Sequence, residues 1–178
     1  MRIRAVVVRA LASALAAALA CDGGLEPEPV PTACPGGLVG ICGTITFQGT
    51  EPPNTEAVYV GAFETFPRSC ADLISFRPLP PQALARPYEG STFYTRSLAN
   101  GTYEWVLAVW KKPGILTFTA ADTALLREAG HYRDPAGPAR PGAVVVSGTG
   151  TESIDFVVDF GNLRPVTDYL SCEAAPQP

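Results

Sequence analysis

The stretch from Ser91 to Trp110 constrains the fold more than any other part of the sequence. Two runs rich in aromatic and β-branched residues flank Asn100-Gly101. Both central residues of a type I′ turn need a positive φ, which Asn-Gly adopts readily, so the pattern predicts a β-hairpin. Apolar side chains alternate along the second run, and the face expected to point inward holds Tyr103, Trp105, Leu107 and Val109. Because this face is strongly apolar, it needs a second sheet to cover it. We therefore expect an all-β, antiparallel β-sandwich of about seven strands.

Residues 1–20 have the pattern of an export signal. Basic residues near the start precede an apolar run, Ala10–Ala20, which is too short and too weakly hydrophobic for a stable transmembrane helix. The run ends Ala18-Leu19-Ala20-Cys21, which allows two interpretations. In one, this is a bacterial lipoprotein signal and Cys21 is lipidated; in the other, ordinary secretory cleavage leaves Cys21 unmodified. The stretch resembles the lipobox of bacterial lipoproteins, except that Leu19 lies one position closer to Cys21 than is usual.

The cysteine count fits lipidation. Five cysteines are an odd number for an exported protein, and assigning Cys21 to the lipid leaves Cys34, Cys42, Cys70 and Cys172. Three pairings of those four are possible in an oxidising compartment. Loop-closure entropy favours Cys34–Cys42 and leaves Cys70–Cys172. Zinc ligation is the alternative, but no C-x₂-C pair is present and the single His131 is remote in sequence, so we expect no metal or cofactor.

Charge and composition define the surroundings of the folded part. The chain has 13 basic and 17 acidic residues; without Arg2, Arg4 and Arg9 of the signal, 10 basic residues remain, for a net charge of −7. Such an acidic surface argues against nucleic-acid binding and leaves the acyl chains on Cys21 as the membrane contact. Residues 21–37 are a Pro-rich tether, 38–172 the domain and 173–178 a flexible tail.

The first part of the domain is expected to contain two strands and a long loop. High β propensity predicts a strand at 38–48, and a run that is apolar on both faces predicts a central strand at 55–64. Residues 65–90 contain five prolines and read as a loop that packs across one sheet, with one helical turn at Gln82–Arg86 and Cys70 pinning it.

The second part is expected to contain one short helix and a last hairpin. A short strand at 115–118 precedes a helix at Ala120–Ala129, which Gly130 would end. Strands at 143–147 and 151–160 would form a hairpin across Gly148-Thr149-Gly150. In the second of them, Ile154, Phe156 and Val158 share a face.

Two segments carry a family resemblance. GTITFQGTEPPNTEAVYVGAF resembles the opening of carboxypeptidase regulatory-like and Cna-B-like domains, and LANGTYEWVL resembles their L-x-x-G-x-Y-x-V segment. The family often has Pro where this chain has Asn100, and a small aliphatic residue near the position of Trp105. The resemblance implies a transthyretin-like sandwich with a binding or scaffolding role rather than catalysis.

The candidate ligand-binding residues are His131, Tyr132, Arg133, Asp134 and Trp110. A His beside an acid and a Tyr is typical of acid–base chemistry, but adjacent residues point in different directions, and the alternative is that Arg133 and Asp134 make structural contacts. Hydroxyisourate hydrolases share a transthyretin-like fold but carry a C-terminal Tyr-Arg-Gly-Ser signature and several histidines, which this chain lacks.

The sequence therefore predicts an envelope-anchored lipoprotein that acts as a non-catalytic binding or accessory module. Its partners would be the membrane, through Cys21, and an envelope protein or glycan. One alternative is a carbohydrate-binding module that uses Trp110 and other exposed aromatic rings. The other alternative is a hydrolase centred on His131.

Overall fold

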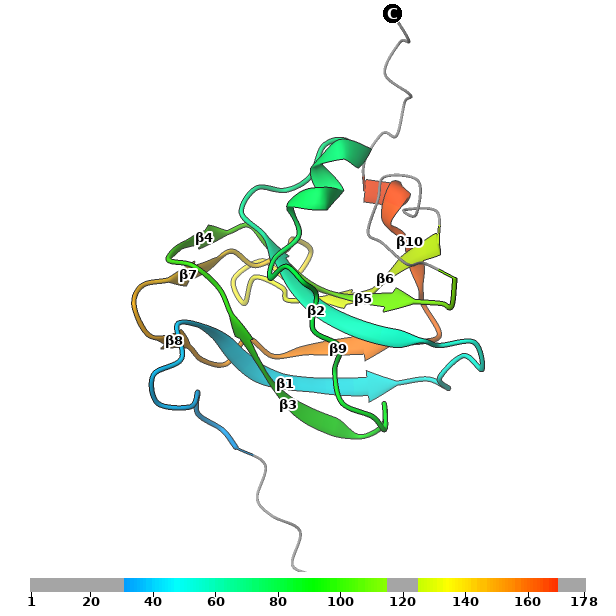
Figure 1. Cartoon of the computed structure of the whole chain (residues 1–178), viewed down its shortest axis with the longest axis horizontal. Helices are drawn as coiled ribbons and strands as arrows, with labels where there is room; N and C mark the ends of the chain where they lie inside the picture. Colours follow the sequence, from blue (N-terminus) through cyan, green and yellow to red (C-terminus); the bar gives the residue numbers. More distant parts are fainter. Residues whose placement is uncertain (1–30, 115–124, 170–178) are drawn as a thin grey trace, which may run out of the picture.

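The computed structural model describes residues 31–114 and 125–169, and these form an all-β structure (Figure 1). Short 3₁₀ helices lie at Cys70–Ser75 (η1) and Val166–Tyr169 (η3). The strands are β1 (Gly40–Gln48), β2 (Ala57–Phe63), β3 (Ser91–Ser97), β4 (Gly101–Tyr103), β5 (Trp105–Lys111), β6 (Leu126–His131), β7 (Val144–Val146), β8 (Gly150–Thr151), β9 (Phe156–Asp159) and β10 (Arg164–Pro165).

The strands form two larger sheets and one small ladder. In the first sheet, β1 pairs antiparallel with β3 on one side and parallel with β8 and β9 on the other. The second sheet is antiparallel, in the order β10-β6-β5-β2. The small ladder joins β4 to β7. In Figure 1 the first sheet lies below the second, so that β1 and β9 face β5 and β6.

The main core lies between the two sheets. Aliphatic side chains from both sheets fill it, among them Ile45, Val60, Val106, Ala108 and Val158, all fully buried. Burial of this apolar area is the principal stabilising term of the fold. Tyr103 and Leu107, which the sandwich prediction requires to be buried, are each 1% exposed.

A second, smaller core covers the outer face of the second sheet. Trp105, Leu107 and Val109 alternate with the residues of the main core, so β5 is buried on both faces. Phe66 and Phe76 pack against this face from residues 65–90, which we call the Pro-rich loop. Val166 packs against it from η3. The prediction that residues 65–90 pack across one sheet is thereby confirmed.

The predicted hairpin across Asn100-Gly101 is wrong. β3 pairs with β1 in the first sheet and β5 pairs with β2 and β6 in the second, so the segment between them crosses from one sheet to the other. Neither Asn100 nor Gly101 has a positive φ, as a type I′ turn would require. Instead, the Asn100 side-chain oxygen accepts a hydrogen bond of 2.7 Å from the Gly148 amide and ties the crossing segment to the turn after β7.

β2 lies at the edge of its sheet, so its prediction as a central strand is also wrong. The Pro-rich loop runs along the free edge: the Ala62 and Arg77 backbones exchange two hydrogen bonds of 2.9 Å, and the Leu84 amide donates to Val58. Covering an edge in this way blocks pairing with other chains. The helical turn of the loop is η1 and not Gln82–Arg86, which is irregular.

Two further predictions fail in the second half of the chain. Residues 126–129 of the predicted helix Ala120–Ala129 belong to strand β6, because pairing with β5 and β10 overrides their helix propensity. Residues 120–124 and the strand predicted at 115–118 lie outside the described residues. The last hairpin does not form either, since β7 pairs with β4 while β9 pairs with β1. The predicted alternation is confirmed, with Ile154, Phe156 and Val158 buried.

No helix in residues 31–114 and 125–169 combines the length and the apolar character that crossing a bilayer would require.

Candidate functional site

The four residues from His131 to Asp134 diverge in the structure. Tyr132 packs against the main core. The Arg133 Nη1 donates to the Pro138 carbonyl oxygen at 2.8 Å, and the Asp134 Oδ1 accepts from the Ala136 amide at 2.8 Å. Arg133 and Asp134 therefore make turn contacts, while His131 lies beside residues from other parts of the chain.

A β-bulge in β6 sets the environment of His131. Gly130 lies opposite Ala108 and Glu128 lies opposite Val109, so Ala129 is an extra residue without a partner. In a regular strand, residues three apart point to opposite faces. The extra residue in the bulge shifts the alternation of side chains by one position, so Glu128 and His131 lie together on the outer face of the second sheet.

Glu128 connects His131 to Tyr169 of η3. One carboxylate oxygen, Oε1, lies 3.1 Å from His131 Nδ1, and the other, Oε2, accepts a hydrogen bond of 2.8 Å from the Tyr169 hydroxyl. The Glu128 and His131 side chains are only 5% and 9% exposed. We call these three residues the Glu–His–Tyr cluster. A buried carboxylate with both oxygens occupied is held firmly, and it holds the imidazole in turn.

Charge and burial keep the Tyr169 hydroxyl protonated. Burial and the hydrogen bond to Glu128 raise the pKa of Tyr169 to about 12, against the opposing effect of Arg164. Because that hydroxyl donates to Glu128, the carboxylate remains an acceptor for His131. In the neutral imidazole, the tautomer that donates to Glu128 has its proton on Nδ1 and leaves Nε2 as a hydrogen-bond acceptor.

A cleft of about 350 Å³ adjoins the cluster. It lies where β6 and β9 approach each other, and its rim carries Gln48, Arg133, Asp155, Asp159, Asn162 and Arg164. One oxygen of each aspartate is used by the backbone, since Asp155 Oδ1 accepts from the Thr44 amide and Asp159 Oδ1 from the Gly161 amide. The cleft is thus mainly polar, with charges of both signs.

Sequence reasoning singled out His131 and Arg133 but missed the other members of this site. Glu128 stands three residues before His131 in a segment that was expected to be helical, and Tyr169 belongs to the C-terminal stretch that no pattern marked. The glycine that follows Ala129 was a signal for a bulge, because glycine within a strand often marks one.

Trp110 does not offer a surface for stacking. Its side chain is packed in the main core with 6% exposure, and its Nε1 donates to Thr55 Oγ1 at 2.8 Å. The exposed large hydrophobic residues of the described part of the chain include no aromatic ring; they are Val39, Ile74, Leu79, Val145 and Val157. An aromatic platform built on Trp110 is therefore not present.

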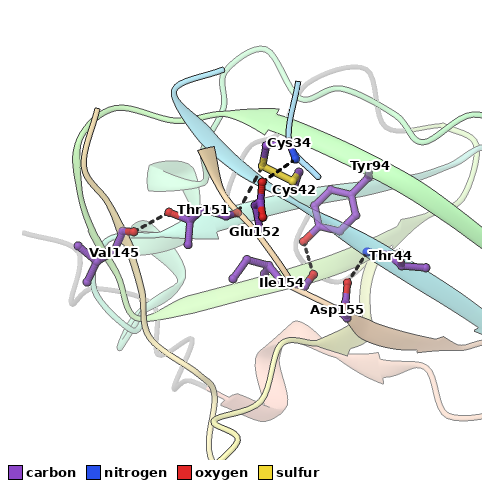
Figure 2. The surroundings of a disulfide bond; sticks show 9 residues. All are labelled: Cys34, Cys42, Thr44, Tyr94, Val145, Thr151, Glu152, Ile154 and Asp155. Carbon is purple, nitrogen blue, oxygen red and sulfur yellow. Dashed lines mark hydrogen bonds between the residues drawn. A yellow bond between two sulfur atoms is a disulfide. The ribbon is translucent and has the colours of Figure 1, made fainter. Parts of the chain in front are cut away.

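The predicted Cys34–Cys42 disulfide is present. It joins the segment before β1 to the buried first half of that strand, and the Cys34 amide donates to Glu152 (Figure 2). Cys70 is also disulfide-bonded, whereas its predicted partner, Cys172, and the predicted lipidation site, Cys21, lie outside the described residues. Within the described ranges, no three His, Cys, Asp or Glu residues are grouped so that they could hold a metal ion.

In comparisons with known proteins, no family model, no curated protein and no solved structure matches this chain. Its function is therefore inferred from its own residues.

Proposed function

We propose that this chain is an exported, lipid-anchored binding module of the bacterial cell envelope, built as an immunoglobulin-like or transthyretin-like β-sandwich. The observation that carries the proposal is disulfide bonding, at Cys34–Cys42 and at Cys70. Disulfides persist in oxidising compartments such as the periplasm and are rare in the cytosol. The export pattern of residues 1–20 agrees with that location.

The anchoring residue in this proposal is Cys21. It follows the apolar run, and the Pro-rich segment after it would hold the domain away from the bilayer. The Cys34–Cys42 bond fixes the end of that segment to the start of β1. The anchor therefore reaches the domain at the Gly40 end of β1.

The polar cleft lies toward the other end of β1 and is the binding site in this proposal. Gln48, the last residue of β1, lines it. The nine residues of β1 span about 25 Å at the usual rise of a strand. In this proposal, that separation holds the cleft away from the anchored end of the domain, where it is open to ligands of the envelope.

The anchor is tested with Cys21→Ala. The wild-type chain, expressed in a bacterial host, is expected to incorporate labelled palmitate, to partition into the detergent phase and to accumulate as a precursor in the presence of globomycin. Cys21→Ala is expected to lose the label and become soluble. The matched control is the double variant Cys34→Ala/Cys42→Ala, which removes two cysteines other than Cys21 and should stay in the detergent phase. A Cys21→Ala variant that fractionates like the wild type would remove the anchor.

A further inference from the structure

We infer that the polar cleft binds a neutral, hydroxyl-rich ligand of the saccharide class, with His131 Nε2 accepting a hydrogen bond from a ligand hydroxyl group. The inference rests on the proposed role as a binding module and names the chemistry of its ligand. The volume of about 350 Å³ falls in the range of small-molecule sites.

His131 supplies one fixed hydrogen-bond acceptor at the wall of the cleft. Its Nδ1 is engaged by Glu128, which is in turn held by Tyr169. Within the described residues, no side chain or backbone group bonds to Nε2, and the residue lines the cleft. A ligand hydroxyl can donate a hydrogen bond to Nε2 of the neutral ring. Because the ring is held by two bonds in series, little ordering remains to be done on binding.

The rim favours a neutral ligand over a charged one. Two guanidinium groups, Arg133 and Arg164, line the cleft with two carboxylates, Asp155 and Asp159. The third carboxylate of the lining, Glu128, already has both oxygens engaged, by His131 and Tyr169. An anionic ligand would be attracted by the guanidinium groups but repelled by the carboxylates. A cationic ligand would be attracted by the carboxylates but repelled by the guanidinium groups. Hydroxyl groups both donate and accept, and therefore satisfy both pairs.

The side-chain amides extend this complementarity. Gln48 and Asn162 both line the cleft, and each side-chain amide offers one acceptor and two donors, which suits neighbouring hydroxyls of a sugar ring. The aspartates keep one carboxylate oxygen each that no backbone amide uses. The sugar site depends on this polar lining and not on Trp110, which is buried.

The single histidine of the chain makes the site directly observable. We would record the imidazole nitrogen resonances of the full-length ¹⁵N-labelled protein during separate titrations. The neutral probes are D-glucose, D-galactose, D-mannose and N-acetyl-D-glucosamine, each to 100 mM; the charged probes are inorganic phosphate and ethylenediamine. At least one sugar is expected to shift Nε2 saturably, and neither charged probe should do so.

Variants connect the shift to the cluster. Glu128→Gln and Tyr169→Phe are expected to weaken the binding of that sugar at least tenfold while the far-ultraviolet spectrum stays that of the wild type. Glu89→Gln makes the same carboxylate-to-amide change at an exposed site outside the cleft and should bind like the wild type. Binding that is unchanged in both cluster variants would overturn the role of His131.

The remaining outcomes are also decisive. A saturable shift with phosphate or ethylenediamine in place of the sugars would overturn the ligand class, and no shift with any probe would overturn the site. Neither result bears on the anchor, which the Cys21→Ala fractionation tests separately. A soluble Cys21→Ala protein that still binds the sugar would support both proposals.

Discussion

Arg96 is a buried cation whose partners are backbone carbonyl groups. Its side chain leaves β3 and donates from Nε to Val60 of β2 at 3.0 Å and from Nη2 to Gln82 of the Pro-rich loop at 2.9 Å. The residue is 6% exposed, and burial lowers the pKa of its guanidinium group from the ordinary value. Arg96 thus joins the edges of both sheets and the loop that covers one of them.

Replacement of Arg96 by Met should destabilise the domain. The substitution preserves much of the volume but leaves the Val60 and Gln82 carbonyl oxygens without their donor, which costs about 2 kcal/mol in the free energy of unfolding. The measurement is the urea midpoint, with Arg140→Met as the control because Arg140 is exposed. Equal midpoints for the two variants would show that the buried guanidinium contributes nothing.

Tyr169 should titrate later than an ordinary phenol. Its pKa is raised from 10.0 to about 12 by burial and by Glu128. Since the folded-state pKa is the higher one, the stability linked to Tyr169 is fully present below pH 10 and is lost as the pH rises through about 12. In absorbance at 295 nm, Tyr169→Phe should therefore remove a late-titrating group.

Glu128→Gln tests the cause of this shift. Loss of the carboxylate charge should move the pKa of Tyr169 back toward 10, whereas Glu89→Gln should leave the titration curve as it is in the wild type. A late part of the titration curve that is the same in the wild type, in Tyr169→Phe and in Glu128→Gln would contradict the hydrogen bond between Tyr169 and Glu128.

At the scale of the elements, the bulge in β6 depends on Gly130. Gly130 has a φ of +155°, and a Cβ built there would overlap the carbonyl oxygen of Val157 in β9. Glycine therefore permits both the bulge and the close approach of β6 to β9 that shapes the cleft.

Gly130→Ala should consequently cost about 3 kcal/mol in the free energy of unfolding, because the new methyl group can be placed only by moving one strand. Gly137→Ala is the matched control, since its Cβ would meet nothing closer than an Asp134 side-chain oxygen at 3.9 Å. Urea unfolding measures the stability, and the His131 ring resonances report the geometry of the cleft. A Gly130→Ala protein with the stability of Gly137→Ala would refute the close approach.

Strand positions were largely readable from the sequence because a period of two in apolar residues is a local signal. β1, β2, β7 and β9 lie within the predicted ranges, and β5 extends one residue past the predicted run, to Lys111. β6 was missed, because its Leu, Arg, Glu and Ala residues favour a helix when judged locally. Only its pairing with β5, a contact distant in sequence, makes it a strand.

At the scale of the whole molecule, strand partners were not readable from the sequence. Asn100-Gly101 has the composition of a tight turn, yet β3 finds seven partners in β1 and β5 finds seven in β2, so both strands pair elsewhere. The site shares this origin. Its members come from β1, β6, β10, η3 and from β9 and its surroundings, and only the assembled sheets bring them to one cleft.

The Cys34–Cys42 disulfide fastens the N-terminal segment to the whole domain. The sulfur of Cys34 lies 3.7 Å from the Thr151 carbonyl oxygen, and the Cys34 amide donates to Glu152, so the bond also supports the two-residue strand β8 (Figure 2). Closing a loop of this length lowers the entropy of the unfolded chain and contributes about 2.5 kcal/mol.

The single variants Cys34→Ala and Cys42→Ala should each lose this contribution, and the double variant should lose little more than the worse single one. The reason is that either substitution already breaks the bond; Cys42→Ala additionally removes a buried sulfur. Urea unfolding gives the three energies, and amide exchange at Gly150 and Thr151 should become faster in all of them. If the energies of the single variants add up in the double variant, the two cysteines stabilise the domain separately, and their bond is not what holds the N-terminal segment to it.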